Sequence, residues 1–332
     1  MSELNKILGR DFIIAFLLPA LFFLVANFLS FEAVSIPHPW LKFNPEKPLE
    51  DTTILGLEAF VFGVFLQSVN RELFRLAEGY WEDYCGETMT RCLGYFQKRR
   101  FRKLKQDLAT LRAERGLCQR EARPFATKAK YNKLSEWEAT RFPRREDLVL
   151  PTTFGNVVRA YEDYPRAVYN FESINGWSRI QALMSKQVAE LLSRTRARVD
   201  MWLNFGFVTS LLMAEIAVLG WKFRKVPFWW LFGAGLLFIV FAYTRARSSA
   251  ARYGEQVKAA FDIYLPQLAQ KLGFVLSQEV EKNRAFWQAY SRLMVYRDPD
   301  ALEEMSAAGL KLASCGRSKP NNAVAGHDDN DE

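Results

Sequence analysis

The sequence has few of the residues that most metal and enzyme sites need. Its 332 residues include two histidines, His38 and His327, and four cysteines, at positions 85, 92, 118 and 315. No CxxC, HExxH or other Cys/His cluster occurs, so zinc, haem and thiol redox sites have no support. A Gly-rich phosphate loop and a GxSxG motif are also missing. We therefore expect no catalytic residues, no metal and no cofactor. An atypical membrane enzyme that uses scattered Glu, Asp and Tyr side chains stays an alternative.

Apolar residues, by contrast, are concentrated in a few long runs. A helix of about 20 apolar residues is long enough to cross a bilayer. The second of the runs is short and contains Glu58 and Gln67, which makes it the least typical. The sequence predicts an all-α protein, a four-span transmembrane helix bundle with a helical cytoplasmic domain. The expected spans are residues 12–31, 54–70, 202–221 and 227–243, which form two hairpins, 12–70 and 201–244.

Lysine and arginine near the span ends predict the orientation, because cytoplasmic flanks carry more of them than outer flanks. With both termini in the cytoplasm, the inner flanks hold Lys6, Arg10, Arg71, Arg75, Arg194, Arg196, Arg198, Arg245, Arg247 and Arg252. The outer flanks hold Lys42, Lys47, Lys222, Arg224 and Lys225. The majority favours the orientation with both termini in the cytoplasm. The outer hairpin WKFRKVP (221–227) is a local exception to the rule.

Three polar residues lie inside the expected spans at similar distances from their outer ends: Asn27, Glu58 and Glu215. A carboxylate costs about 2.5 kcal/mol or more at the centre of a bilayer, so it indicates a functional site with a partner. We expect these residues to form a polar layer, with the cations of the outer basic hairpin, Lys222, Arg224 and Lys225, reaching toward it. The layer either lines a water-filled vestibule or pore in an oligomer, or is structural, with both glutamates reaching the headgroups or pairing within the bundle.

The remaining chain divides into segments of different composition. Residues 1–11 form a cytoplasmic N-terminus, and 32–53 an outer loop. Apolar residues at helical spacing predict a cytoplasmic helical domain in 71–200 and amphipathic helices in 245–315 that pack on it. The polar end of the chain, 316–332, is expected to be disordered.

A basic cluster, QKRRFRKLKQ, lies in the first of these amphipathic helices. Three interpretations compete for it: a solvated helix face, contact with anionic lipid headgroups, and nucleic-acid binding. The last is disfavoured because no nucleic-acid-binding motif accompanies the cluster. The basic residues are Lys98, Arg99, Arg100, Arg102, Lys103 and Lys105.

The segment LPTTFGNVVRAYEDYP, residues 150–165, differs in texture from its helical flanks. Thr153 is expected to cap a short helix that ends at Pro165. Adjacent carboxylates point apart, so Glu162 and Asp163 do not make an acid/base pair. The segment is either a structural elbow or a cytoplasmic recognition loop, with Asn156, Arg159, Glu162, Asp163 and Trp177 as its candidate contacts.

This segment, with Tyr169, Glu172 and Trp177 after it, resembles one shared by uncharacterised bacterial multi-pass membrane proteins. The resemblance covers about thirty-five residues and the layout of the spans. It implies a bacterial inner-membrane setting and no catalytic activity.

Together these features predict a non-enzymatic, oligomeric inner-membrane protein. Its cytoplasmic domain would sense an unidentified cytoplasmic protein or small molecule and alter the packing or permeability of the bundle. A channel or a defence effector would fit this layout. The alternative is a membrane-anchored scaffold in which the intramembrane glutamates are structural.

Overall fold

The computed structural model describes residues 9–32, 48–81, 86–121, 123–223 and 226–307. This part of the chain is helical and contains no strand, which confirms the predicted all-α class. Four of its helices are long and apolar enough to cross a membrane: Arg10–Glu32, Thr52–Glu78, Lys186–Lys222 and Trp229–Lys271. The four-span prediction is therefore confirmed. Most of the expected outer loop and the whole of the expected disordered tail lie outside the described residues.

The membrane-side elements are α2 (Arg10–Phe12), η1 (Ile13–Leu17), α3 (Leu18–Glu32), α4 (Pro48–Glu78), α11 (Lys186–Phe223) and α12 (Val226–Lys271). The other elements are α6 (Glu87–Arg120), α7 (Lys128–Arg141), η2 (Glu146–Leu148), α8 (Thr153–Glu162), α9 (Tyr164–Tyr169), α10 (Ser173–Leu183), α13 (Val280–Tyr296) and α14 (Asp300–Ala307).

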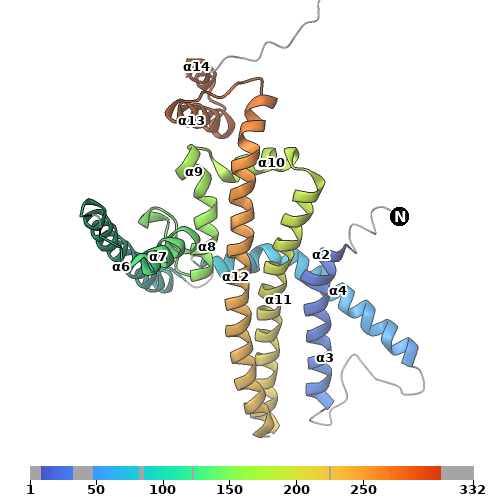
Figure 1. Cartoon of the computed structure of the whole chain (residues 1–332). Helices are drawn as coiled ribbons and strands as arrows, with labels where there is room; N and C mark the ends of the chain where they lie inside the picture. The colour runs from blue at the N-terminus through green and yellow to red at the C-terminus, as the bar shows by residue number, and fades with distance from the viewer. Residues whose placement is uncertain (1–8, 33–47, 82–85, 122, 224–225, 308–332) are drawn as a thin grey trace, which may run out of the picture.

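Three of the four long apolar helices run side by side, while α4 runs obliquely away from them (Figure 1). Aromatic contacts hold the three together: the Phe22 ring of α3 lies 5.5 Å from Phe205 of α11 and 5.9 Å from Phe238 of α12. On α4, the outward stripe of Ile54, Leu57, Val61 and Phe65 is exposed. Apolar side chains exposed along such helices suit contact with lipid.

A widened turn of π-helix, η1, interrupts the first span immediately before Leu18 and Pro19. Proline has no N–H and crowds the carbonyl four residues earlier, so Ala15 O loses its usual helical donor. Asn204 of α11 replaces that donor: its Nδ2 donates to Ala15 O at 3.0 Å, and the residue is fully buried. An apolar environment makes an unpaired carbonyl costly, which explains an asparagine inside the third span.

Helices α11 and α12 are much longer than the expected spans, because they continue without a break into the extramembrane domain. One hydrophobic core there joins residues from both segments that were predicted to be cytoplasmic, among them Phe154, Phe171, Phe261 and Trp287. Described residues of the segments 71–200 and 245–315 therefore share one core. Helices α13 and α14 lie at the end of this unit farthest from the spans (Figure 1).

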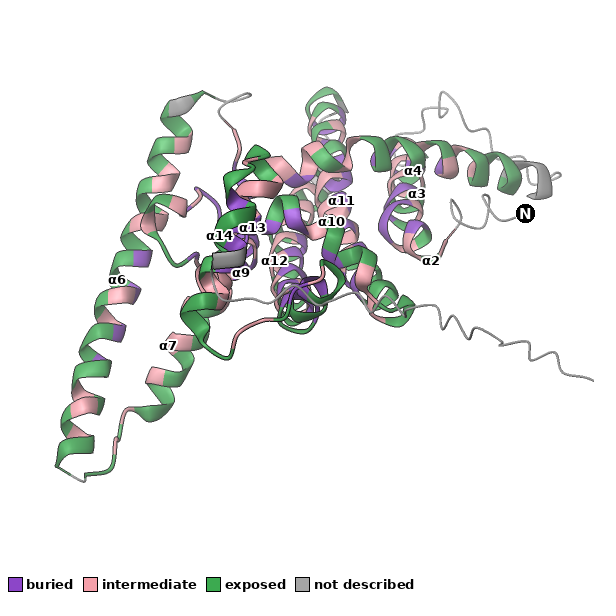
Figure 2. Ribbon diagram, turned by 90° about the horizontal axis from the view of Figure 1, so that it is seen from above, coloured by how far each residue is buried: buried purple, intermediate pink, exposed green. Residues whose placement is uncertain are grey.

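Helices α6 and α7 form an antiparallel arm that projects from one side of the bundle, opposite α4 (Figure 2). Its inner seam is the predicted apolar stripe of α6, in which Phe101, Leu104, Leu108 and Leu111 are buried. The arm has few contacts with the rest of the protein outside its base, where α7 meets α8 and α12. We call α6 and α7 the arm below.

Candidate functional site

The start of the 150–165 segment joins the spans to the extramembrane domain. Thr152 caps α8, since its Oγ1 accepts from Gly155 N at 2.8 Å, and the same hydroxyl donates to the carbonyl oxygens of Ala77 and Glu78 at 2.8 Å. The expected cap, Thr153, is one residue too late. The Thr153 hydroxyl instead bonds the Tyr243 hydroxyl of α12 at 3.0 Å. This junction ties α8 to the ends of two spans.

Gly155 allows the close approach in this junction. A Cβ at this position would lie 2.0 Å from the carbonyl oxygen of Glu78. No side chain fits there without moving the backbone of α4 away from α8. The short motif TTFG is thus explained by packing rather than by chemistry.

The five candidate recognition residues do not meet at one point. Asn156 is buried and structural: its side chain bonds both the N–H and the C=O of Leu150, at 2.7 and 3.0 Å. Arg159 pairs with Glu162 at 3.2 Å. Asp163 faces the other side of α8 and accepts from Arg144 N at 3.3 Å.

Glu162 and Trp177 line a small aromatic cavity of about 250 Å³ together with Arg196 of α11. Burial raises the pKa of the Glu162 carboxyl, and the nearby Arg159 and Arg196 guanidinium groups offset only part of this effect. Arg196 is held by Asp200 at 3.2 Å and lies 3.9 Å from the centre of the Phe74 ring. The ion pairs Arg159–Glu162 and Arg196–Asp200 balance the charges of this cluster, while Arg159 Nε is buried without a hydrogen-bond partner among the described residues.

The larger cavity lies on the opposite side of α8 and encloses about 730 Å³. Its walls come from the arm, from α8 and α9, and from α12, which are far apart in the sequence. We call it the arm cleft. Its charged lining residues are Lys105, Arg112, Glu136, Glu138, Arg144, Asp163, Glu255, Lys258 and Asp262.

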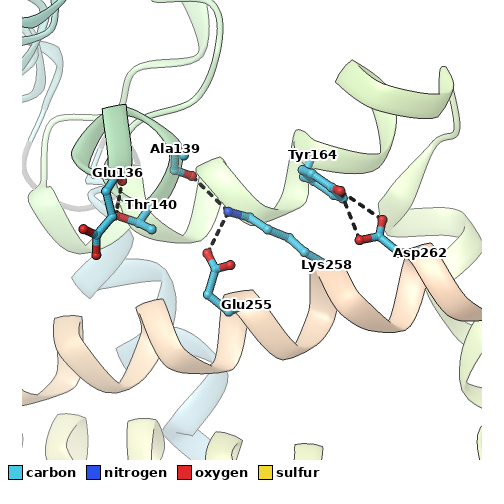
Figure 3. Close-up of polar contacts among 7 residues, drawn as sticks. All are labelled: Glu136, Ala139, Thr140, Tyr164, Glu255, Lys258 and Asp262. Carbon is cyan, nitrogen blue, oxygen red and sulfur yellow. Dashed lines mark hydrogen bonds and ion pairs between the residues drawn. The ribbon is translucent and has the colours of Figure 1, made fainter. Parts of the chain in front are cut away.

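Lys258 lies at the centre of the arm cleft (Figure 3). Its side chain is 11% exposed, and its Nζ donates to Ala139 O of α7 and to Glu255, both at 2.9 Å. The ammonium group also lies 5.6 Å from the centre of the Tyr164 ring. Lys258 is therefore a direct link between α12 and the arm.

One turn further along α12, Asp262 accepts hydrogen bonds from two tyrosines of α9. Tyr164 donates at 2.9 Å and Tyr169 at 2.7 Å. Burial, with the adjacent carboxylate, raises the pKa of Tyr164 to about 12 and that of Tyr169 further. Both phenols therefore stay neutral and act as donors, which makes them poor nucleophiles.

The charges in the arm cleft are of both signs and nearly balanced. Arg112 and Lys105 both pair with Glu138 across the arm, the former at 3.1 Å. A cleft of this kind fits a polar ligand or peptide segment that carries both charges better than a simple anion. A charged group of such a ligand would compete with the hydrogen bonds of Lys258 that hold the arm against α12.

The expected polar layer is only partly assembled. Asn27 Nδ2 donates to the Glu215 carboxylate, so the first and third spans meet there. Glu58 makes no hydrogen bond or ion pair with the described residues. On the same helix, Phe60 packs on Phe12 at 5.8 Å and Phe62 packs on Phe23 at 5.0 Å, so α4 crosses the first span over this stretch. The placing of Glu58 in one layer with Asn27 and Glu215 stays a prediction.

The outer basic hairpin is only partly described. Arg224 and Lys225 lie outside the described residues, and Lys222 is exposed at the end of α11. The partner that the structure gives Glu215 is the uncharged Asn27. The expected contact of this carboxylate with the hairpin cations stays a prediction.

The basic cluster of α6 divides into two groups. Arg102 donates to Glu146 at 2.8 Å, and Lys105 pairs with Glu138 of α7, so these two stabilise the base of the arm. The other four are exposed or half-buried: Lys98, Arg99, Arg100 and Lys103.

Several polar residues of these sites were missed from the sequence. Lys258 and Asp262 lie at i and i+4 on α12, an ordinary pattern for a solvated helix face. Their role depends on α7 and α9, which are distant in the sequence. The role of Asn204 could have been predicted from the sequence. Pro19 in the first span leaves one backbone carbonyl without its helical donor, and Asn204 in the third span is a side chain that can supply one.

The described residues contain no group of three His, Cys, Asp or Glu side chains arranged to hold a metal ion. Comparison with protein-family models, curated proteins and solved structures gives no match to this chain. The resemblance of the 150–165 segment therefore stays a prediction. The function must be argued from the geometry of the arm cleft, the junction and the spans.

Proposed function

We propose that this chain is a non-enzymatic sensor protein that is embedded in the bacterial inner membrane, with both termini in the cytoplasm. The arm cleft binds a polar cytoplasmic ligand or protein segment. The spans respond by changing their packing or permeability, within a homo-oligomer. Neutral, hydrogen-bonded tyrosines beside Asp262 favour binding over catalysis in this cleft.

The continuity of α12 is the observation that carries the proposal. This helix runs without a break from Val226 to Lys271. It bonds to α8 through Tyr243 and to the arm through Lys258. Lys258 lies about 22 Å along the helix from Tyr243. A ligand that separates Lys258 from the arm would change the forces on the same helix that packs against α3 and α11.

The proposal is tested by ion flux through liposomes that contain the purified full chain. Lys258→Met keeps the length of the side chain but removes its two hydrogen bonds. Lys271→Met makes the same change at an exposed position of the same helix and is the control. We expect Lys258→Met to change the flux and Lys271→Met to leave it unchanged.

The scaffold alternative predicts equal behaviour of both variants. A second comparison distinguishes a pore from a scaffold. Glu215→Gln should change the flux, because the Glu215 carboxylate of the third span accepts a hydrogen bond from Asn27 of the first span. Glu58→Gln should not, because Glu58 makes no hydrogen bond or ion pair with the described residues. No flux in any variant would refute the permeability part of the proposal.

A further inference from the structure

The N-terminal half of α6 presents an aromatic and basic surface. Tyr95 is 60% exposed and Phe96 is 59% exposed, and their rings are 6.0 Å apart. Arg99 and Lys103 follow at spacings of three and four residues from Phe96 and from each other, so they share its face. Cys92 is exposed on the same side. We call Cys92, Tyr95, Phe96, Arg99 and Lys103 the lipid face.

The lipid face is on the far side of α6 from the arm's apolar seam. Phe101, Leu104 and Leu108 pack inward, and helical spacing directs the lipid face away from them. Large aromatic side chains left outward beside cations are unusual for a surface that contacts water alone.

The position of α6 brings this face to the level where the spans leave the membrane. Gly79 and Tyr80, at the end of α4, line a shallow cavity with Tyr95 of α6. That end of α4 is bonded through Thr152 to the start of α8, which in turn bonds Tyr243, the last residue of the expected fourth span.

The direction of α6 agrees with this position. Seen from above in Figure 2, α6 is viewed along its whole length, so it runs across the direction of the bundle. In the side view of Figure 1 it begins near the level at which α4 ends. It therefore leaves the spans at a shallow angle to the expected membrane surface. Its N-terminal half is the part of the arm nearest that surface.

We propose that the lipid face docks on anionic lipid headgroups of the membrane that the spans cross. Aromatic rings are favoured at the membrane–water interface, and basic side chains are attracted to anionic headgroups. The two features coincide here on one helix face at the height of the interface. Docking would hold the base of the arm, and the cleft behind it, against the membrane.

Cys92 provides a reporter for this contact. In the full chain, Cys85, Cys118 and Cys315 are replaced by Ser, and Cys92 is labelled with an environment-sensitive fluorophore. The protein is reconstituted in phosphatidylcholine alone or mixed with phosphatidylglycerol, with a headgroup-labelled quencher lipid in each. We expect strong quenching in the anionic mixture and much less in phosphatidylcholine.

Charge reversal tests which residues carry the contact. Each basic residue near an anionic surface changes the docking equilibrium about fivefold. Arg99→Glu with Lys103→Glu should therefore weaken docking by more than about 25-fold. Lys128→Glu with Lys130→Glu, at the far end of the arm, makes the same charge change and should have little effect.

The aromatic part is tested separately by Tyr95→Ser with Phe96→Ser, which should reduce quenching in the anionic mixture without changing the charge. Circular dichroism checks that each variant keeps its helix content. Equal quenching in both lipid mixtures, equal loss in the two charge reversals, or no quenching in any lipid would overturn the proposal.

Discussion

The contact between Asn204 and Ala15 O gives the sharpest test of how the spans are held together. Asn204→Leu removes the donor to a carbonyl that Pro19 cannot serve. Hydrogen bonds between membrane helices contribute about 0.6–1.7 kcal/mol, and an unpaired buried acceptor costs about 1–3 kcal/mol. We therefore expect Asn204→Leu to lower the free energy of unfolding by about 2 kcal/mol.

A second change separates this bond from general packing. Pro19→Ala returns an N–H to residue 19, so Ala15 O regains a donor within its own helix. In that background Asn204→Leu should cost about 1 kcal/mol less, a coupling that a double-mutant cycle measures.

The assay is unfolding by sodium dodecyl sulfate in mixed micelles, followed by circular dichroism. Ser210→Ala is the control. Ser210 lies on the same helix as Asn204, and its hydroxyl donates to the carbonyl oxygen of Gly206 in that helix. It should change the stability by less than about 0.5 kcal/mol. If Asn204→Leu lowers the free energy of unfolding equally in wild type and in Pro19→Ala, Asn204 does not compensate for the donor that Pro19 lacks.

Three further predictions concern the junction, the charge cluster and the polar pair. Gly155→Ala should lower the stability by about 3 kcal/mol, because its Cβ meets the carbonyl oxygen of Glu78; a variant as stable as wild type would contradict the close approach. Burial raises the pKa of the Glu162 carboxyl above its usual 4.5, so its contribution to stability is full below pH 4.5 and is lost as the pH rises through the folded-state pKa. Denaturation midpoints measured across pH test this: in Glu162→Gln the stability should fall less as the pH rises. A variant with the same dependence of stability on pH as wild type would contradict burial of the Glu162 carboxylate. Asn27→Ala and Glu215→Gln should couple by about 1 kcal/mol in a double-mutant cycle, and additive costs would show that the pair is not formed.

The helical class and the four apolar spans could be predicted from the sequence because both depend on local composition. A run of apolar residues long enough to cross a bilayer has few other stable conformations. The seam of the arm followed from helical spacing in the same way, since Phe101 and Leu104 belong to one stripe. The polar cap of α8 was predicted to within one residue.

The candidate site was harder to predict, because it depends on how helices cross. Depth along the sequence predicts Glu58 near Glu215, but the partner that the structure gives Glu215 is Asn27 of the first span. The bond between Asn27 and Glu215 joins residues 188 positions apart. Lys258 is similarly joined to α7, which a single sequence does not place next to α12.

The central claim, that the arm cleft and the spans are coupled through α12, is tested most directly by spin-label distances in liposomes. One pair of labels, at Leu21 and Leu237, reports on α3 against α12 within the bundle. A second pair, at Lys133 and Lys271, reports on the position of the arm. We predict that Lys258→Met changes both distance distributions. A change in the arm with an unchanged bundle would contradict the account.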